Sequence, residues 1–319
     1  MRQPPHAFDR DRAAPIGPPV DAAVAIGLEP LRAAGRRWPA LLGAVLTVLM
    51  VLGLGRELFG QGLAGLTRSV PAGPLFYLWF ALFYLSLPVG DYLIFRHLWG
   101  IPPSGLAATL KKRIANEVIF SYSGEAYFYS WARANARMVA APFGAVKDVS
   151  ILSAMAGNAA TLALMAVSIP LGHALLPDGM TETIAWSAAI VVAMSLPFLV
   201  FSRRVFTLDR PTLWWIFRAH CLRLLAGSVL IALAWHAAMP AVPAAMWLFL
   251  AAGRLLVSRL PLLPNKDLLF ANLAILVIGP GEALSELVAF TAALTLLVHL
   301  TLIVGSSVHL LARARTEPR

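Results

Sequence analysis

The sequence predicts an all-α, polytopic integral membrane protein: a helical bundle of about eight transmembrane helices with one or two re-entrant or broken segments. Of its 319 residues, 59% are hydrophobic and only 13% are charged, whereas soluble domains carry about 45–50% apolar and about 25% charged residues. Apolar runs also recur at lengths in or near the roughly 17–25 residues that cross a bilayer as a helix. These features exclude a disordered chain, a nucleic-acid-binding domain and a typical cytosolic enzyme.

The position of the basic residues predicts how the chain crosses the membrane. Lys and Arg gather in cytoplasmic loops, so the net charge of +10 is read as topology rather than as a nucleic-acid footprint. With Arg223 counted in the segment 202–223 and Arg254 and Arg259 in 254–267, 24 basic residues fall in alternate, cytoplasmic segments and 2 in the others. We therefore expect a multi-pass protein of the bacterial inner (plasma) membrane with both termini in the cytoplasm. The apolar runs are 39–55, 74–95, 148–170, 184–201, 219–239, 244–260, 268–279 and 287–311.

The chain divides by composition into three predicted parts. Residues 1–38 hold six Arg and six Pro and lack the apolar core of a signal peptide, which indicates a Pro/Arg-rich cytoplasmic tail. Residues 39–311 form the transmembrane domain, and 312–319 form a basic cytoplasmic tail. The short run 268–279 either crosses as a broken or tilted helix or re-enters; crossing is preferred, because re-entry breaks the alternation of charge.

Two segments look broken. In the connection 96–147, a basic cluster is followed by a short apolar run, a Ser/Gly break and an aromatic run, which predicts a re-entrant hairpin. A second, Pro-marked break at 258–267 precedes the short run 268–279. A pair of broken segments points to a transporter's binding site. The alternatives are a cytoplasmic amphipathic helix for the first segment and an ordinary loop for the second.

Single polar residues within these segments are candidate site residues. Glu125 follows Gly124 in the first break, and a carboxylate near a bilayer needs a partner or a role. Its candidate partners are Arg133, Arg137 and Lys147; the alternative is an ion pair that only fixes the hairpin. Asp148, next to Lys147, favours a helix N-terminus through the helix dipole, which is a structural role.

Other patterns have structural interpretations. Asp91 and Arg96 are interpreted as a boundary pair at the end of the second span. Gly157 belongs to a small-residue face of the third span, which favours close helix packing. Thr291, Thr295 and His299 recur every four residues in the last span and must face the bundle interior or a wet cavity, as interhelical hydrogen bonds or, alternatively, as a proton relay.

Most catalytic motifs are missing from the sequence, and the His-x-x-x-x-Asp spacing of His173 and Asp178 is interpreted as chance. No Gly-Lys dipeptide, and hence no phosphate-binding loop, occurs, and neither does His-Glu-x-x-His or Gly-x-Ser-x-Gly. A single cysteine excludes an internal disulfide and a cysteine metal cluster. We expect no catalytic residue, no metal and no cofactor.

The order of the polar motifs resembles a known family. Asn116, Gly124-Glu125, Lys147-Asp148 and Pro264-Asn265-Lys266-Asp267 follow one another as in the transmembrane region of lysylphosphatidylglycerol synthases and related flippase-like membrane proteins. There, an Asn precedes a Gly-Glu break, a charged pair opens the next span, and a second break precedes the closing helices. The resemblance covers roughly residues 40–311 and implies lipid handling or lipid transport rather than aminoacylation.

These observations lead to one functional expectation and one alternative. We expect a protein that binds or translocates an anionic lipid or polyprenyl-phosphate headgroup in a cytoplasm-facing cavity between the broken segments, with membrane lipids as partners. Glu125 and Asp267 would orient the basic side chains. The alternative is a non-transporting membrane scaffold or assembly factor. The side chains expected to attract phosphate are Lys111, Lys112, Arg113, Arg133, Arg137, Arg259 and Lys266.

Overall fold

The part of the chain that the computed structural model describes consists of helices and their connections, with no strand among the described residues. It comprises residues 70–118, 123–135, 143–172, 206–260, 265–279 and 282–316, with the single positions Leu52, Trp186, Ala189, Ala193 and Leu263. All of these lie within the unit Leu42–Arg319. The helices with residue-level bounds are α4 (Pro74–Trp99), α5 (Gly105–Val118), α6 (Ser123–Asn135), α7 (Phe143–Gly172), α10 (Arg210–Ala238), α11 (Ala244–Val257), α12 (Lys266–Ile278) and α13 (Ala283–Thr316).

Four of these helices contain segments long and apolar enough to cross a membrane: Pro74–Trp99, Gly144–Val167, Arg210–Ala238 and Ala283–Gly305. The all-α class is therefore confirmed, and the four helices are compatible with a membrane protein. Eight spans remain a prediction. The predicted tail 1–38 lies outside the described residues, as do the predicted spans 39–55 and 184–201 apart from single positions.

Large apolar side chains on the outer faces of the long helices fit an apolar surrounding. Leu75 of α4, Leu222 of α10 and Leu297 of α13 are each more than half exposed. A soluble protein rarely exposes extended apolar surface of this kind, whereas lipid covers it at no cost.

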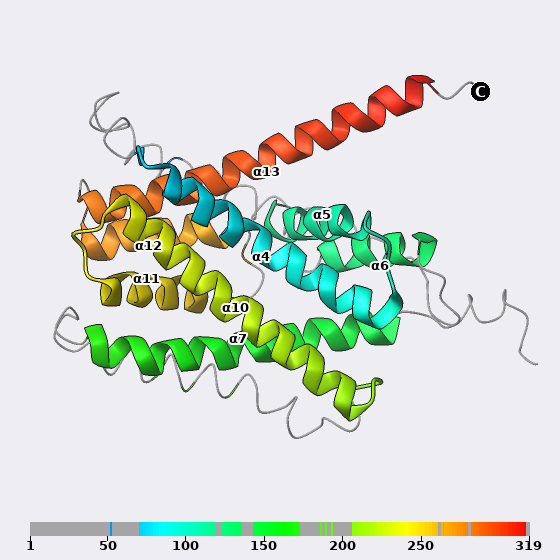
Figure 1. The fold of residues 1–319 in the computed structure, drawn as a ribbon, viewed down its shortest axis with the longest axis horizontal. Helices are drawn as coiled ribbons and strands as arrows, with labels where there is room; N and C mark the ends of the chain where they lie inside the picture. The colour runs from blue at the N-terminus through cyan, green and yellow to red at the C-terminus, as the bar shows by residue number, and fades with distance from the viewer. Residues whose placement is uncertain are drawn as a thin grey trace, which may run out of the picture. The chain divides into compact units, whose positions relative to one another are not determined.

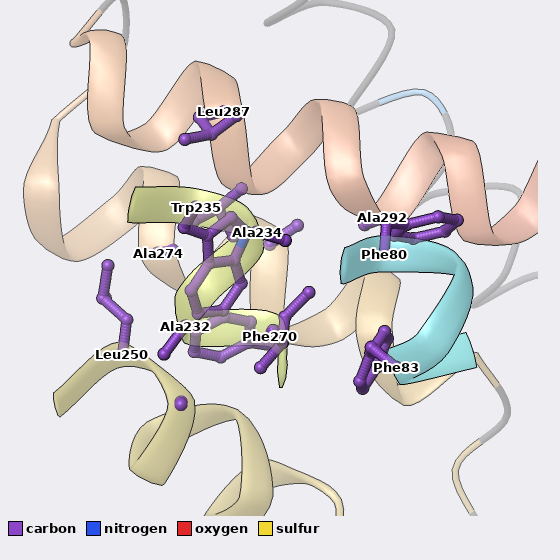
Figure 2. Close-up of a cluster of buried hydrophobic side chains, with 14 of the residues drawn as sticks. Phe80, Phe83, Ala232, Ala234, Trp235, Leu250, Phe270, Ala274, Leu287 and Ala292 are labelled. Atoms are coloured by element: carbon purple, nitrogen blue, oxygen red, sulfur yellow. The ribbon is translucent and has the colours of Figure 1, made fainter. Parts of the chain in front are cut away.

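The long helices are held together by two apolar clusters. The first joins Phe80 and Phe83 of α4 and Trp235 of α10 to side chains of α11, α12 and α13 (Figure 2). The second joins Phe95 of α4 and Phe128 of α6 to α5, α7 and the first half of α10. Helix α10 packs along α4 more extensively than any other described pair. Figure 1 shows the course of these helices. The residues of α4 and α10 between the two clusters are more polar.

The short helices form the two segments that the sequence marks as broken. Helices α5 and α6 pack against each other across a break, and α11 and α12 flank a second break (Figure 1). Each of the four has 13 or 14 residues, which is about 20 Å at 1.5 Å per residue. A bilayer core is about 30 Å thick, so none of them alone reaches across it.

Candidate functional site

The α5–α6 hairpin is closed by a glycine. A Cβ atom on Gly124 would lie 2.1 Å from the Lys112 carbonyl oxygen, so only glycine lets the start of α6 lie against α5. The Gly124 N–H donates to Asn116 Oδ1 at 2.7 Å, and Ser123 Oγ donates to the Ala115 carbonyl at 2.7 Å. Gly124 and Asn116 thus hold the turn of the hairpin.

Glu125 faces α5 rather than the arginines that follow it. Asn116 Nδ2 donates to Glu125 Oε1 at 3.3 Å, and Lys112 Nζ lies 3.5 Å from the same oxygen. The predicted partner Arg133 is exposed, and Lys147 instead lies 3.5 Å from Asp148. The predicted pairing of Glu125 with Arg133 or Lys147 is therefore wrong. Glu125 lies in the first turn of α6, which packs against α5, so its carboxylate lies beside Lys112. Arg137 lies outside the described residues.

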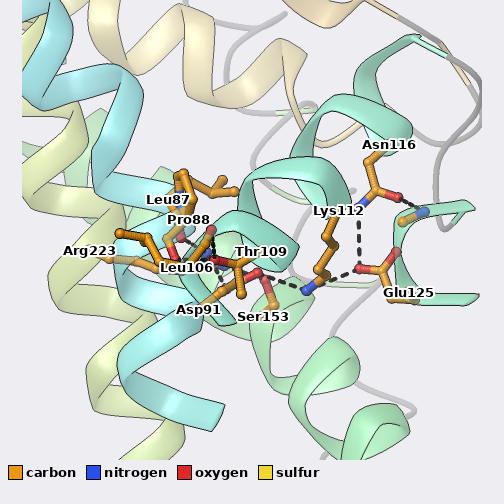
Figure 3. Close-up of polar contacts among 11 residues, drawn as sticks. Leu87, Pro88, Asp91, Leu106, Thr109, Lys112, Asn116, Glu125, Ser153 and Arg223 are labelled. Carbon is orange, nitrogen blue, oxygen red and sulfur yellow. Dashed lines mark hydrogen bonds and ion pairs between the residues drawn. The ribbon is translucent and has the colours of Figure 1, made fainter. Parts of the chain in front are cut away.

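Lys112 connects this hairpin to a buried carboxylate at the α4–α10 interface (Figure 3). Lys112 Nζ donates to Asp91 Oδ2 at 2.7 Å, and Arg223 Nη1 donates to Asp91 Oδ1 at 2.6 Å. Arg223 Nη2 also donates to Ser153 of α7 at 2.8 Å. The three charged side chains are at most 8% exposed. Asp91 is thus the hub of a buried triad, and the predicted boundary pair with Arg96 is wrong: Arg96 instead donates to the Tyr92 hydroxyl.

Pro88 of α4 leaves a backbone carbonyl free to accept a second polar contact from α5. Pro88 has no N–H, so the carbonyl of Tyr84 one turn earlier loses its helical partner. The Arg113 guanidinium donates to this carbonyl, and it lies 4.2 Å from the centre of the Tyr84 ring. Thr109 donates to the Pro88 carbonyl at 2.9 Å. Helix α4 and α5 are therefore joined by polar bonds inside the bundle.

The two broken segments meet. The backbone N–H of Asn265, in the second break, donates to the carbonyl of Glu117 near the end of α5 at 2.9 Å. Asn265 has a left-handed backbone (φ 47°), which asparagine tolerates better than most residues. Two residues later, Asp267 forms an ion pair with Arg254 of α11, with 2.6 Å between Asp267 Oδ1 and Arg254 Nη2. We call α11 and α12 the second hairpin, and the contact between Glu117 of α5 and Asn265 the hairpin junction.

A small cavity lies at the hairpin junction. Its polar lining comes from α5, the second break, α12 and α13, and its volume open to water centres is about 10 Å³, room for about one water molecule. This is far too small for a phosphate headgroup. The lining residues are Glu117, Asn265, Asp267, Leu268, Ala292, Thr295, Leu296 and His299.

The polar stripe of the last span is buried, as predicted. Thr291 accepts a hydrogen bond from Trp235 Nε1 at 3.0 Å, so this position forms the expected interhelical bond. Thr295 and His299 are 4% and 2% exposed and line the cavity. His299 Nε2 has no hydrogen-bond partner in the described structure.

Burial and charge set the protonation of the cavity carboxylates. Burial and the nearby Asp267 raise the pKa of Glu117 above its ordinary value, against the opposing effect of Arg113, Lys266 and Arg254. Burial alone would also raise the pKa of Asp267, but its pairing with Arg254 holds that pKa below its ordinary value. The two carboxyl groups therefore differ: Asp267 stays ionised and Glu117 binds a proton more readily.

Two cations lie together at the second break. Lys266 Nζ donates to the Ser258 carbonyl at 2.9 Å, and the Arg259 guanidinium donates to Ser258 Oγ. Burial, and to a smaller extent Arg259, lower the pKa of Lys266, while Glu117 opposes them. Arg259 also packs on the small-residue face of α7, because a Cβ on Gly157 would lie 1.7 Å from its Nη1. Because the positive charges of Lys266 and Arg259 repel each other, an anion bound between them would be stabilised.

The remaining predicted residues have other surroundings. Asp148 is fully buried and accepts bonds from Thr207 N, Thr207 Oγ1 and Leu208 N at 2.7–2.9 Å. It therefore fastens the segment that leads into α10, which is a structural contact of a different kind from the predicted helix-dipole role. Lys111 is half-buried on α5.

Four residues of the network were not among the candidates from the sequence: Asp91, Glu117, Arg223 and Arg254. Arg223 and Arg254 had been counted as loop charges, yet both lie within helices, Arg223 near the middle of α10. One signal was available for Asp91, because it is an acidic residue three positions after Pro88 inside a long apolar run.

The described structure thus defines a class: a helical protein compatible with a membrane location, whose long apolar helices enclose a network of buried charges. No family model, no curated protein and no solved structure matches the chain. The resemblance to lysylphosphatidylglycerol synthases therefore stays an expectation from the sequence.

Proposed function

We propose that the protein binds the anionic headgroup of a membrane lipid, such as a phospholipid or polyprenyl phosphate, at the second break and carries it across the membrane. One observation supports this most directly: Arg259 and Lys266 lie together at the break, beside Ser258 and at the N-terminus of α12. A phosphate there would relieve the repulsion of the two cations and face the positive end of a helix dipole.

The other basic side chains contribute differently from the expectation. Lys112 is committed to Asp91 and Glu125, and Arg113 to the Tyr84 carbonyl. These residues hold α5 in place, and Arg259 and Lys266 bear the proposed headgroup contact. Because the junction cavity holds about one water, the proposed headgroup enters only when the two hairpins move apart.

The alternative function, a non-transporting scaffold, also has an observation in its favour. The triad of Asp91, Lys112 and Arg223 and the pair of Arg254 with Asp267 neutralise most of the interior charge. A scaffold needs such pairs for structure alone.

The test compares Arg259→Gln and Lys266→Gln with Arg218→Gln, which neutralises an exposed arginine of α10. The full chain is reconstituted in vesicles of phosphatidylglycerol or of phosphatidylcholine, and lipid affinity and headgroup transfer are measured. A hydrogen bond to a charged group contributes about 1.5–3 kcal/mol, so each of the first two variants should weaken phosphatidylglycerol binding about tenfold or more. Wild-type affinity in both variants, or equal affinity for the two lipids, would contradict the proposal and favour the scaffold.

A further inference from the structure

The cavity at the hairpin junction brings together groups that can hold a proton. Glu117 lies near the end of α5, Asp267 in the first turn of α12 and His299 on α13, so three elements contribute one titratable group each. His299 adds a buried imidazole to the two carboxyl groups. It is 2% exposed, it lines the cavity, and its Nε2 atom has no partner in the described structure.

The size of the cavity limits what it can hold. About 10 Å³ of space for water centres admits roughly one water, and a lone imidazole nitrogen beside two carboxyl groups gives such a water its hydrogen-bond partners. The described residues contain no group of three or more His, Cys, Asp or Glu side chains arranged to hold a metal ion. The chemistry of the lining therefore favours a proton shared through one water over a metal ion.

We propose that Glu117, Asp267 and His299 form a proton-binding site, and that its protonation sets whether the two hairpins stay joined. Glu117 takes a proton from water and returns it to water, and no bond other than its O–H forms or breaks. When Glu117 is protonated, only Asp267 is ionised in the cavity, and Arg254 compensates it at 2.6 Å. When Glu117 is ionised, two carboxylates repel each other across the junction.

The charged groups around Glu117 determine the direction of the effect. Asp267 favours its protonated form, whereas Arg113, Lys266 and Arg254 favour the carboxylate, and burial tips the balance toward protonation. A carboxyl group whose pKa is higher in the closed junction than in the open one binds protons more tightly when closed. The junction is therefore most stable at low pH and loses stability as the pH rises through the pKa of Glu117.

The structure offers a local readout of this opening. The Asn265 N–H donates to the Glu117 carbonyl, so its hydrogen exchange, corrected for the intrinsic effect of pH, reports separation of the two segments. For the wild-type full chain in vesicles, we expect this exchange to increase several-fold from about pH 5 to about pH 9. This measurement needs no variant, so a wild-type exchange that is independent of pH overturns the proposal.

Two matched variants identify the group. Glu117→Gln imitates the protonated side chain and should keep the low exchange at both pH values. Glu282→Gln makes the same change at an exposed position next to α13 and should keep the wild-type pH dependence. A wild-type pH dependence in Glu117→Gln, or a response to sodium at constant pH, contradicts the proton site.

A role for this proton in transport rests on the proposed function, whereas the proton site itself does not. Loss of phosphatidylglycerol selectivity with an intact pH response would remove the lipid function alone. Intact selectivity without a pH response would remove the proton site alone.

Discussion

Replacing Asp91 with asparagine should destabilise the protein more than any other single neutralisation in the described helices. Asp91→Asn keeps the shape of the side chain and removes its charge. Lys112 and Arg223 then lose the carboxylate that lies 2.7 and 2.6 Å from them. Lys112 retains Glu125 at 3.5 Å, and Arg223 retains only neutral acceptors, among them Ser153.

The magnitude follows from burial. Removing one partner of a buried ion pair costs about 3–5 kcal/mol, because the other charge stays buried without compensation. A change of 1 kcal/mol moves the melting temperature by about 2–4 °C in chains of about 150–250 residues, and a longer chain lies at the lower end. We therefore expect a decrease of roughly 6–10 °C.

Tryptophan fluorescence of the detergent-solubilised chain measures the transition, because Trp235 and Trp247 are buried in the first apolar cluster. Glu282→Gln, an exposed neutralisation, should leave the melting temperature unchanged. The double variant Asp91→Asn/Arg223→Gln no longer contains the unpaired Arg223 charge. Its loss of unfolding free energy should therefore be smaller than the sum of the two single losses, by about 0.5–3 kcal/mol. A melting temperature of Asp91→Asn equal to that of the control, or strictly additive losses, would show that the triad is not buried as a unit.

Two glycine substitutions test the close contacts of the site. Gly124→Ala should separate α5 from α6 and lower the melting temperature, because its Cβ would meet backbone, whereas Gly73→Ala has nothing within 4 Å and serves as the matched control; equal thermal shifts would refute the close packing. Gly157→Ala should leave stability nearly unchanged but displace the flexible end of Arg259, so phosphatidylglycerol binding should weaken as it does in Arg259→Gln. Unchanged lipid affinity in Gly157→Ala would count against Arg259 as the headgroup contact.

The features predictable from the sequence were those encoded locally. Composition predicted the helical class, and the Ser/Gly sequence around Gly124 and the prolines of 258–267 marked the two breaks. In the structure, the close approach of α5 restricts position 124 to glycine. The period of Thr291, Thr295 and His299 predicted a buried polar stripe, since residues four apart share a helix face. Each of these depends on residues close together in the chain.

The pairings were not predictable because they join distant residues. Asp91 and Arg223 are 132 positions apart, and no local pattern relates them. The count of basic residues also assigns Arg223 to the cytoplasmic segment 202–223, because Lys and Arg gather in cytoplasmic loops. In the structure α10 continues through Arg223, because Asp91 compensates its charge inside the bundle.

The described contacts are unevenly distributed, and this suits a protein that opens at one place. Helices α4 and α10 pack along their length, whereas α5 touches α13 only sparsely, and one backbone hydrogen bond joins Glu117 to Asn265. Regions with few apolar contacts open at lower free energy than the global unfolding. Under the proposal, an added charge in the junction cavity would therefore act on one of the sparser contacts among the described helices, while the Asp91 triad would keep α4, α5 and α10 together.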